Sequence, residues 1–364
     1  MIRLFQSEPL VSPLRGLLGE NPESLKALLG ELGEPGYRAT QILEWVYQRG
    51  AESYESMSNL PKALRAKLAD FLPIFESEMS IQQESTDGTI KRLLRWKDGT
   101  TSECVLIPDA DRRTACISTQ VGCPVRCVFC ASGIDGLERN LTTAQIVEQA
   151  MRARQVCAPE RLSNIVFMGL GEPLANYEAT VHALRILNAP WGMGIGARKI
   201  TISTVGLPDQ MRRLVDEGLQ VTIALSLHAP TDDLRKELIP WAQSVSIESL
   251  IDAARYYFDR TGREITLEYV LLGGVNDAPD QARLLAAIAA RMRCNVNLIA
   301  YNPVEKLPFE RPSPDAVARF ADVLRGKGVN THVRRSRGLD IDGACGQLRR
   351  RHAGHFVAAP DKSR

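Results

Sequence analysis

From Thr114 onward, short apolar runs alternate regularly with amphipathic stretches of helical periodicity, and this alternation constrains the fold more than any other feature of the sequence. Apolar runs bounded by polar residues are typical of buried strands, and repeated strand–helix units form a parallel sheet. The pattern predicts an α/β fold with its active site at the C-terminal ends of the strands. The number of strands indicates an open or incomplete barrel. We expect strands at residues 115–119, 164–168, 199–204, 221–227, 265–272, 295–300 and 331–334, and helices near 143–156, 178–188, 208–217, 246–259, 276–292 and 314–327.

A different pattern covers the first hundred residues. Helical periodicity at 24–32 and 38–49, followed by a helix from Leu60 to Phe71 with proline in its first turn, predicts a small helical module. Three strands should follow at 80–85, 89–96 and 101–107, because Asp87-Gly88 and Asp98-Gly99 between them are hairpin signals. We therefore divide the chain into an N-terminal helical accessory module (1–75), a β-meander linker (76–112), a barrel domain (113–348) and a basic C-terminal tail (349–364).

The cysteines are unevenly distributed, since five of the eight fall between residues 104 and 130. The N-terminus carries Glu8 and Pro9 where a signal peptide needs an apolar core. No apolar run approaches the roughly 20 residues of a membrane span. We therefore expect a cytoplasmic protein, whose thiols are kept reduced by glutathione. Clustered cysteines in that compartment point to a metal or to catalysis.

Cys123, Cys127 and Cys130 have the spacing C-x3-C-x2-C directly after the first strand of the βα series. Pro124 disfavours helical geometry at Cys123, which suits a loop that wraps a metal. Three thiolates are one short of the four that close a [4Fe–4S] cluster or a structural zinc site, so one position would stay open for a substrate or cofactor. Two alternatives remain: three buried cysteines without a ligand, or a zinc site completed by Cys116 or a distant histidine.

This spacing and several further motifs resemble the RlmN/Cfr family of radical S-adenosylmethionine RNA adenosine methyltransferases. The motifs are Ala115-Cys-Ile-Ser-Thr-Gln-Val-Gly-Cys, Met168-Gly-Leu-Gly-Glu-Pro, Ala224-Leu-Ser-Leu-His-Ala, Ala300-Tyr-Asn-Pro and Gly338-Leu-Asp-Ile-Asp-Gly-Ala-Cys-Gly-Gln-Leu. Arg38-Ala-Thr-Gln-Ile-Leu-Glu-Trp-Val-Tyr and Met57-Ser-Asn-Leu-Pro resemble the RlmN branch, which methylates carbon-2, rather than Cfr, which methylates carbon-8. The resemblance covers most of the chain and implies an incomplete (β/α)6-type radical-SAM barrel.

The resemblance also implies the cofactors and their ligands. Cys123, Cys127 and Cys130 would hold one [4Fe–4S] cluster, whose open iron chelates S-adenosyl-L-methionine, and two molecules of that cofactor would be used per turnover. Strand-end residues would contact it; they are Gly171, Glu172, Ser203, Ser226, Leu227, His228 and Asn302. A plain turn at Gly171-Glu172, ordinary strand-end caps and a core histidine are the alternatives that residue type alone leaves open.

In the family's mechanism a mobile-loop cysteine, here Cys345, is methylated to S-methylcysteine and then carries that carbon to the adenine. A strand cysteine, here Cys116, resolves the resulting protein–RNA crosslink and forms a transient disulfide with Cys345. Glu103 stands at the family's proton-acceptor position. If the resemblance is set aside, residue type alone leaves other interpretations. The two cysteines could be small hydrophobic core residues, although the polar, glycine-flanked neighbours of Cys345 argue against this for Cys345. Glu103 could be a solvated strand carboxylate. Cys104, Cys157 and Cys294 are expected to be structural.

Composition says little about the partner. The formal net charge of +2 excludes a strongly basic coat protein but leaves room for a local basic face. Residues 331–364 could form such a face, since they include eight basic and three acidic residues and have a net charge of +5. This segment could contact RNA phosphates; the alternative is a solvated tail with no partner. The family implies 23S rRNA and tRNA as substrates, an RNA-binding role for the helical module, and an electron donor such as a flavodoxin-type protein. We expect a monomer that does not bind membranes.

Three competing functions remain open at this point. A Cfr-type enzyme would methylate carbon-8 of rRNA. A radical enzyme acting on a peptide or small molecule would share the cluster but would not need Cys116 and Cys345 as a pair. A non-enzymatic RNA-binding module stabilised by zinc or a cluster would lack the methyl mark. Metal analysis and mass spectrometry of the Cys345 peptide separate these possibilities.

Overall fold

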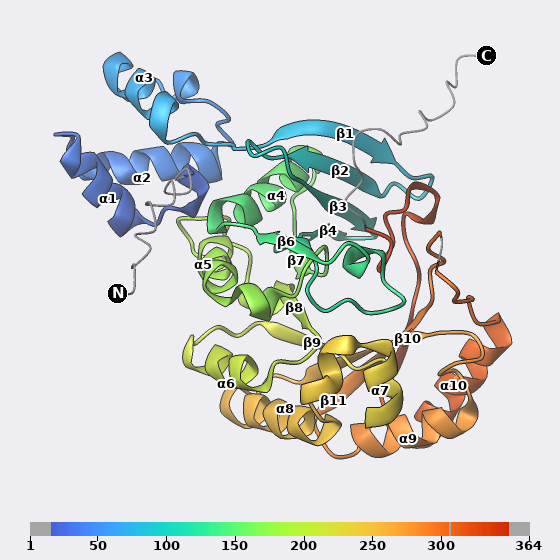
Figure 1. Cartoon of the computed structure of the whole chain (residues 1–364). Helices are drawn as coiled ribbons and strands as arrows, with labels where there is room; N and C mark the ends of the chain where they lie inside the picture. Colours follow the sequence, from blue (N-terminus) through green and yellow to red (C-terminus); the bar gives the residue numbers. More distant parts are fainter. Residues whose placement is uncertain (1–15, 306, 349–364) are drawn as a thin grey trace, which may run out of the picture.

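The computed structural model describes residues 16–305 and 307–348. The chain begins with a cluster of helices that projects from one end of the molecule (Figure 1). These are α1 (Pro22–Glu31), α2 (Tyr37–Leu43), which continues as a π-helical turn (Glu44–Gln48), and α3 (Lys62–Phe71). Asn21 caps α1 by accepting a hydrogen bond from the backbone of Ser24 at 2.8 Å, and proline stands in the first turn. The predicted helical module is therefore present.

The strands form one continuous ten-stranded sheet in the order β1-β2-β3-β4-β7-β8-β9-β10-β11-β12. The first four strands pair antiparallel, and every pairing from β4 onward is parallel. The antiparallel strands are β1 (Glu78–Glu84), β2 (Ile90–Arg95), β3 (Thr101–Asp109) and β4 (Arg112–Cys116); the others are β7 (Asn164–Phe167), β8 (Ile200–Thr204), β9 (Thr222–Ser226), β10 (Ile265–Leu271), β11 (Cys294–Ala300) and β12 (Thr331–Arg334).

Helices follow the parallel strands and cover the outside of the curved sheet (Figure 1). They are α4 (Thr143–Gln155), α5 (Tyr177–Asn188), α6 (Pro208–Asp216), α8 (Ile247–Thr261), α9 (Pro279–Ala289) and α10 (Pro314–Gly326). Parallel strands buried on both faces are rich in Ile, Val and Leu, and the side chains of Ile165, Ile202, Ile223, Leu267 and Leu298 are all fully buried. The prediction of an α/β partial barrel is thus confirmed.

The structure adds two elements that the sequence patterns did not predict. A small separate sheet joins β5 (Gln120–Gly122) to β6 (Leu137–Asn140), and α7 (Asp232–Leu238) follows β9. The first barrel strand also ends earlier than expected, because pairing with β3 sets Cys116 opposite Val105 and makes Cys116 the last residue of β4. No helix in the described ranges is long and apolar enough to cross a membrane. The expected basic tail at 349–364 lies outside the described residues.

Candidate active site

A cavity opens at the C-terminal ends of the parallel strands, where the alternation of strands and helices predicted it. It brings together residues from nearly every loop that follows a strand. Its lining includes Cys123, Cys127 and Cys130 from the loop after β5, Gly171 and Glu172 after β7, Ser203, Ser226 and His228 from β8 and β9, Glu268 from β10, Asn302 after β11, and Cys345 and Leu348 from the segment after β12.

The three clustered cysteines line this cavity and lie on one loop. The backbone of this loop packs closely on itself at a glycine. A Cβ on Gly133 would lie 2.7 Å from the Cα of Arg126, so only glycine fits there. The loop is anchored by Val125 and Phe129, which pack in a buried apolar cluster next to the cysteines. Each thiol therefore has a fixed position and faces the same space.

Burial raises the pKa of the Cys123 thiol to about 12, and burial together with the two neighbouring thiols raises the pKa of Cys127 well above its ordinary value. Thiols in such a place are neutral unless a cation compensates for their charge, and ligation to iron or zinc does this. Within the described ranges, no group of three His, Cys, Asp or Glu side chains is arranged to hold a single metal ion. Cluster ligands bind separate irons and need not converge on one point, so this donor set fits an iron–sulfur cluster.

Glu172 supplies a buried carboxylate beside the cysteine loop. Its two oxygens accept hydrogen bonds from the backbone N–H groups of Leu174 (2.9 Å) and Val205 (2.8 Å). Burial nevertheless raises the pKa of Glu172 to about 7, because amides balance a buried negative charge less completely than a cation does. A ligand ammonium in the cavity would supply that cation, so the site fits the amino group of an amino-acid cofactor.

Gly171, which precedes this carboxylate, has a φ of +105°, and a Cβ there would approach the Cβ of Gln120 to 2.7 Å. The same glutamine accepts a hydrogen bond from the backbone N–H of Glu172 at 2.8 Å. The turn after β7 is therefore pressed against the segment after β4, and this contact fixes where the Glu172 carboxylate enters the cavity.

The cavity lining also includes the remaining polar residues predicted from strand ends. The Oγ atoms of Ser203 and Ser226 lie 3.2 Å apart, on adjacent strands. His228 has a left-handed backbone (φ 58°), and its Nδ1 accepts a hydrogen bond from the backbone N–H of Val270 at 3.1 Å. Burial and the charge of Arg235 lower the pKa of His228 to about 3, so the imidazole is neutral and carries its proton on Nε2. Leu227, also predicted to contact the cofactor, packs its side chain in the main core instead of lining the cavity.

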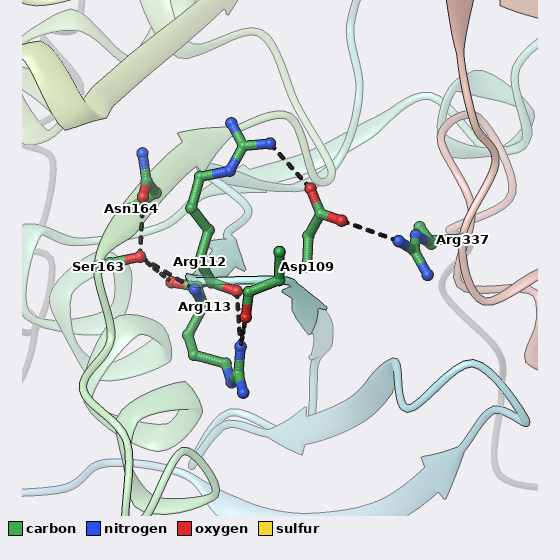
Figure 2. Close-up of polar contacts among 7 residues, drawn as sticks. Asp109, Arg112, Arg113, Ser163, Asn164 and Arg337 are labelled. Carbon is green, nitrogen blue, oxygen red and sulfur yellow. Dashed lines mark hydrogen bonds and ion pairs between the residues drawn. The ribbon is translucent and has the colours of Figure 1, made fainter.

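Cys345 reaches the cavity from a loop that lies against the outer side of the barrel mouth. The side-chain amide of Asn302 donates to the backbone carbonyl of Cys345 at 3.0 Å. Arg337, where the loop begins, pairs with Asp109 at 3.0 Å, and Figure 2 shows that the same carboxylate also binds Arg112. The cysteine is exposed although it faces the cavity, as a group that must meet both a cofactor and a large substrate requires.

Cys116 and Glu103 lie beside the cavity rather than in its wall. Cys116 packs in a small apolar cluster with Leu170 and Leu348, and Leu348 is shared with the cavity lining. Burial and the Cys345 thiol both raise the pKa of Cys116. Glu103 is 4% exposed and forms an ion pair with Lys91, with 3.3 Å between Nζ and Oε1. Glu103 is therefore buried, and the alternative of a solvated carboxylate is wrong.

Sequence reasoning missed two charged groups near this cavity. Glu268 projects from the middle of β10, accepts a hydrogen bond from Asn297 at 2.8 Å, and has its pKa raised to about 7 by burial. Arg235 is 1% exposed, and its guanidinium interacts electrostatically with Cys127. A charge inside an otherwise apolar strand was the available signal for Glu268. Cys104 and Cys157 lie in the main core, and the partly buried Cys294 packs against it.

Two family models match the chain. Residues 117–286 match the radical SAM superfamily, and residues 16–74 match the N-terminal domain of the ribosomal RNA large subunit methyltransferase. Proteins named probable dual-specificity RNA methyltransferase RlmN from Rhodopirellula baltica and Symbiobacterium thermophilum are 47% and 46% identical, over 92% of this chain and 90% and 91% of theirs. A crystal structure of a radical SAM methyltransferase from Sphaerobacter thermophilus has 47% identity and a TM-score of 0.90, covering 92% of this chain and 99% of that one.

Proposed function

This chain belongs to the RlmN family of radical S-adenosylmethionine RNA methyltransferases, and from that membership we propose that it methylates carbon-2 of adenosine. The proposed targets are one adenosine in the peptidyl-transferase region of 23S rRNA and one in the tRNA anticodon loop. Dual specificity is what the names of the relatives state for those proteins. A target base must leave its stack to enter the cavity, which costs least in irregular RNA.

We propose that Cys123, Cys127 and Cys130 hold one [4Fe–4S] cluster. Glu172 would bind the ammonium of S-adenosylmethionine, and Gly171 would let the backbone approach it. Polar contacts around the rest of the cofactor would come from Ser203, Ser226, His228 and Asn302, whereas Leu227, packed in the core, would shape the floor of the site from behind. When bound, cluster and cofactor supply the methyl group and the one-electron chemistry that removes a hydrogen atom from an S-methyl group.

The protein's own residues would carry out the transfer. The Cys345 sulfur takes a methyl group and forms a C–S bond, and that carbon later bonds to carbon-2 of the adenine. Glu103 accepts the proton that leaves carbon-2, and the one unpaired electron of the adduct would return to the redox chain that supplied it. The Cys116 thiolate then attacks the Cys345 sulfur; the S–C bond breaks, its electron pair goes to the transferred carbon, which takes up a proton, and a Cys116–Cys345 disulfide forms. Thiols of the surrounding medium reduce the disulfide.

The wider setting is part of the same proposal. The helical module (1–75) would bind RNA next to a β-meander (76–112), a barrel domain (113–348) and a basic tail (349–364). The protein would act as a cytoplasmic monomer without membrane contact, and a flavodoxin-type protein would deliver the one electron that starts each turnover. The excess of basic over acidic residues at positions 331–364 supports an RNA partner.

One observation carries the proposal: Cys345 lines the same cavity as Cys123, Cys127 and Cys130, and Cys116 packs against Leu348, which also lines that cavity. The test is mass spectrometry of the purified protein together with product analysis. We expect the wild-type Cys345 peptide to be heavier by one methylene group. Cys345→Ala should retain about four irons per chain but transfer no methyl group to RNA, whereas Cys157→Ala should behave as wild type.

Full turnover by Cys345→Ala would overturn this mechanism. Chromatography of the modified nucleoside against 2-methyladenosine and 8-methyladenosine standards decides the position. A product with the methyl group on carbon-8 would reassign the enzyme to the Cfr type while leaving the cysteine chemistry intact. Separate assays with rRNA and tRNA fragments show whether both are substrates.

A further inference from the structure

Lys91 connects two parts of the proposed site that come from opposite ends of the sequence. Its Nζ lies 3.3 Å from Oε1 of Glu103 and donates a hydrogen bond to the backbone carbonyl of Asp342, also at 3.3 Å. The side chain is 6% exposed, and that of Glu103 is 5% exposed. One buried ammonium thus contacts two groups. The first is Glu103, the proposed proton acceptor, and the second is Asp342, three positions before Cys345 in the loop that carries the methyl group.

Strand register explains why these groups meet. Lys91 on β2 is paired with Val105 on β3, and Val105 is paired with Cys116 on β4. Residues directly opposite each other in an antiparallel sheet share a face. Glu103, two residues before Val105, projects from the same face. Lys91, Glu103 and Cys116 therefore form one patch on the side of the sheet where the Cys345 loop lies.

The loop has a conformation that needs support at the point where Lys91 binds it. Asp342 has a left-handed backbone with φ of 51°, which costs free energy for a residue that is not glycine. A hydrogen bond between the backbone N–H of Gly343 and the carbonyl of Gly338 (2.8 Å) closes this turn. The ammonium of Lys91 donates to the carbonyl of the strained residue, which stabilises that conformation.

Two other contacts from the same hairpin hold the loop at its exposed rim. Asp87 accepts a hydrogen bond from the backbone N–H of Gly338 at 3.0 Å, and Asp340 accepts one from Ser85. Lys91 differs from them because its second partner is the buried carboxylate of Glu103. Removing its charge would leave Glu103 buried without this cation, and such a carboxylate takes up a proton.

We infer that Lys91 is a positioning residue that keeps Glu103 ionised and docks the Cys345 loop over it. The inference rests on the proposed function. In the step it serves, the C–H bond at carbon-2 of the covalent adduct breaks, its electron pair stays in the ring, and the proton forms an O–H bond on Glu103. Methylation of Cys345 comes before this step and does not need Lys91.

The test compares Lys91→Met, Lys91→Gln and a matched control, Arg92→Met. Arg92 is the next residue on β2, is similarly buried, and points to the other face, where it donates to the backbone carbonyl of Arg152 at 2.7 Å. Each variant is assayed for iron content, for the methylene mark on Cys345, for RNA–protein adduct on denaturing gels, and for hydrogen exchange of residues 338–346.

We expect both Lys91 variants to keep the iron and the methylene mark while the adduct accumulates about tenfold or more, corresponding to at least 1.4 kcal/mol in the resolving step. Lys91→Gln retains a donor for the Asp342 carbonyl, so its loop should exchange more slowly than that of Lys91→Met. Arg92→Met should show no adduct. Normal turnover without adduct in Lys91→Met or Lys91→Gln would overturn the inference. Loss of the methylene mark on Cys345 in a Lys91 variant that keeps its iron would also overturn it. Absence of the mark from the wild type would instead overturn the proposed function.

Discussion

The side-chain amide of Asn302 donates a hydrogen bond to the backbone carbonyl of Cys345 at 3.0 Å. Its carbonyl oxygen accepts hydrogen bonds from Ser336 at 2.6 Å and Arg311 at 3.0 Å. Asn302 follows β11, so the barrel rim holds the Cys345 loop from one side while the β1–β2 hairpin holds it from the other. The position of the Cys345 sulfur is thus set by contacts with two separate parts of the sheet.

Asn302→Ala should loosen this loop without unfolding the barrel. Loss of the bond to Cys345 and of an acceptor for Ser336 and Arg311 should cost about 1–3 kcal/mol of local stability. We expect hydrogen exchange of residues 336–348 to accelerate roughly five- to 100-fold. Asn188→Ala is the control, because Asn188 donates to the carbonyl of Ile195 at 2.8 Å, far along the chain from this loop. Equal hydrogen-exchange rates of residues 336–348 in both variants would show that the hydrogen bonds of Asn302 do not hold the loop.

Cys116→Ala should stall the reaction after the RNA has become attached to Cys345. Without a thiolate to attack the Cys345 sulfur, the S–C bond of the adduct stays intact. An RNA-dependent band shift on denaturing gels should appear, and it should disappear when the RNA is digested. Cys104→Ala is the matched control, since Cys104 neighbours Glu103 but is buried in the main core on the other face of the sheet. Normal turnover of Cys116→Ala without an adduct would show that Cys116 does not resolve the crosslink.

Gly171→Ala should disturb both folding and cofactor binding. A Cβ at φ +105° is strained, and it would overlap the Cβ of Gln120 at 2.7 Å. We expect a loss of about 2–4 kcal/mol in the free energy of unfolding, measured with urea. Gly194→Ala tests the strain alone, because Gly194 also has a positive φ (65°) but no atom lies within 4 Å of its Cβ position; it should lose only about 1–2 kcal/mol. Equal losses would show that the contact with Gln120 is unimportant.

Glu76→Gln should stabilise the protein at neutral and alkaline pH. Burial and the nearby charge of Glu148 raise the pKa of Glu76 from 4.5 to about 7, and one of its oxygens is buried without a hydrogen-bond partner. The folded state holds this proton more tightly than the unfolded state, so ionisation weakens folding as the pH rises from about 4.5 to 7. The variant should gain about 1–3 kcal/mol at pH 8 and almost nothing below pH 4.5. A gain that does not vary with pH would argue against this cause.

Much of the fold follows from patterns that are local in the sequence. The alternation of apolar runs and amphipathic segments predicts the parallel strands to within a few residues, because each strand must be buried and each helix must cover it. The largest error was at the first barrel strand, which ends at Cys116 instead of Thr119. Apolar character continues past Cys116, but pairing with β3 determines where the strand stops.

The candidate site was predictable where residues follow strands in parallel register. Cys123, Glu172 and His228 meet in one cavity because parallel strands bring their C-terminal ends together. The antiparallel side was not predictable in the same way. Lys91 and Glu103 belong to different strands, and only the register of β2 with β3 makes them partners. A single sequence carries no direct signal for that register across the sheet.

The contacts between the β1–β2 hairpin and the Cys345 loop have a consequence for biosynthesis. The bonds that join Ser85 to Asp340, Asp87 to Gly338 and Lys91 to Asp342 span 251 to 255 positions of sequence. At roughly 5–20 residues per second, the hairpin waits tens of seconds after leaving the ribosome before its partner is translated. A nascent chain therefore has the loop with Cys123, Cys127 and Cys130 long before it has Cys345, and the hairpin keeps buried polar groups without these partners until the last barrel strand has been made.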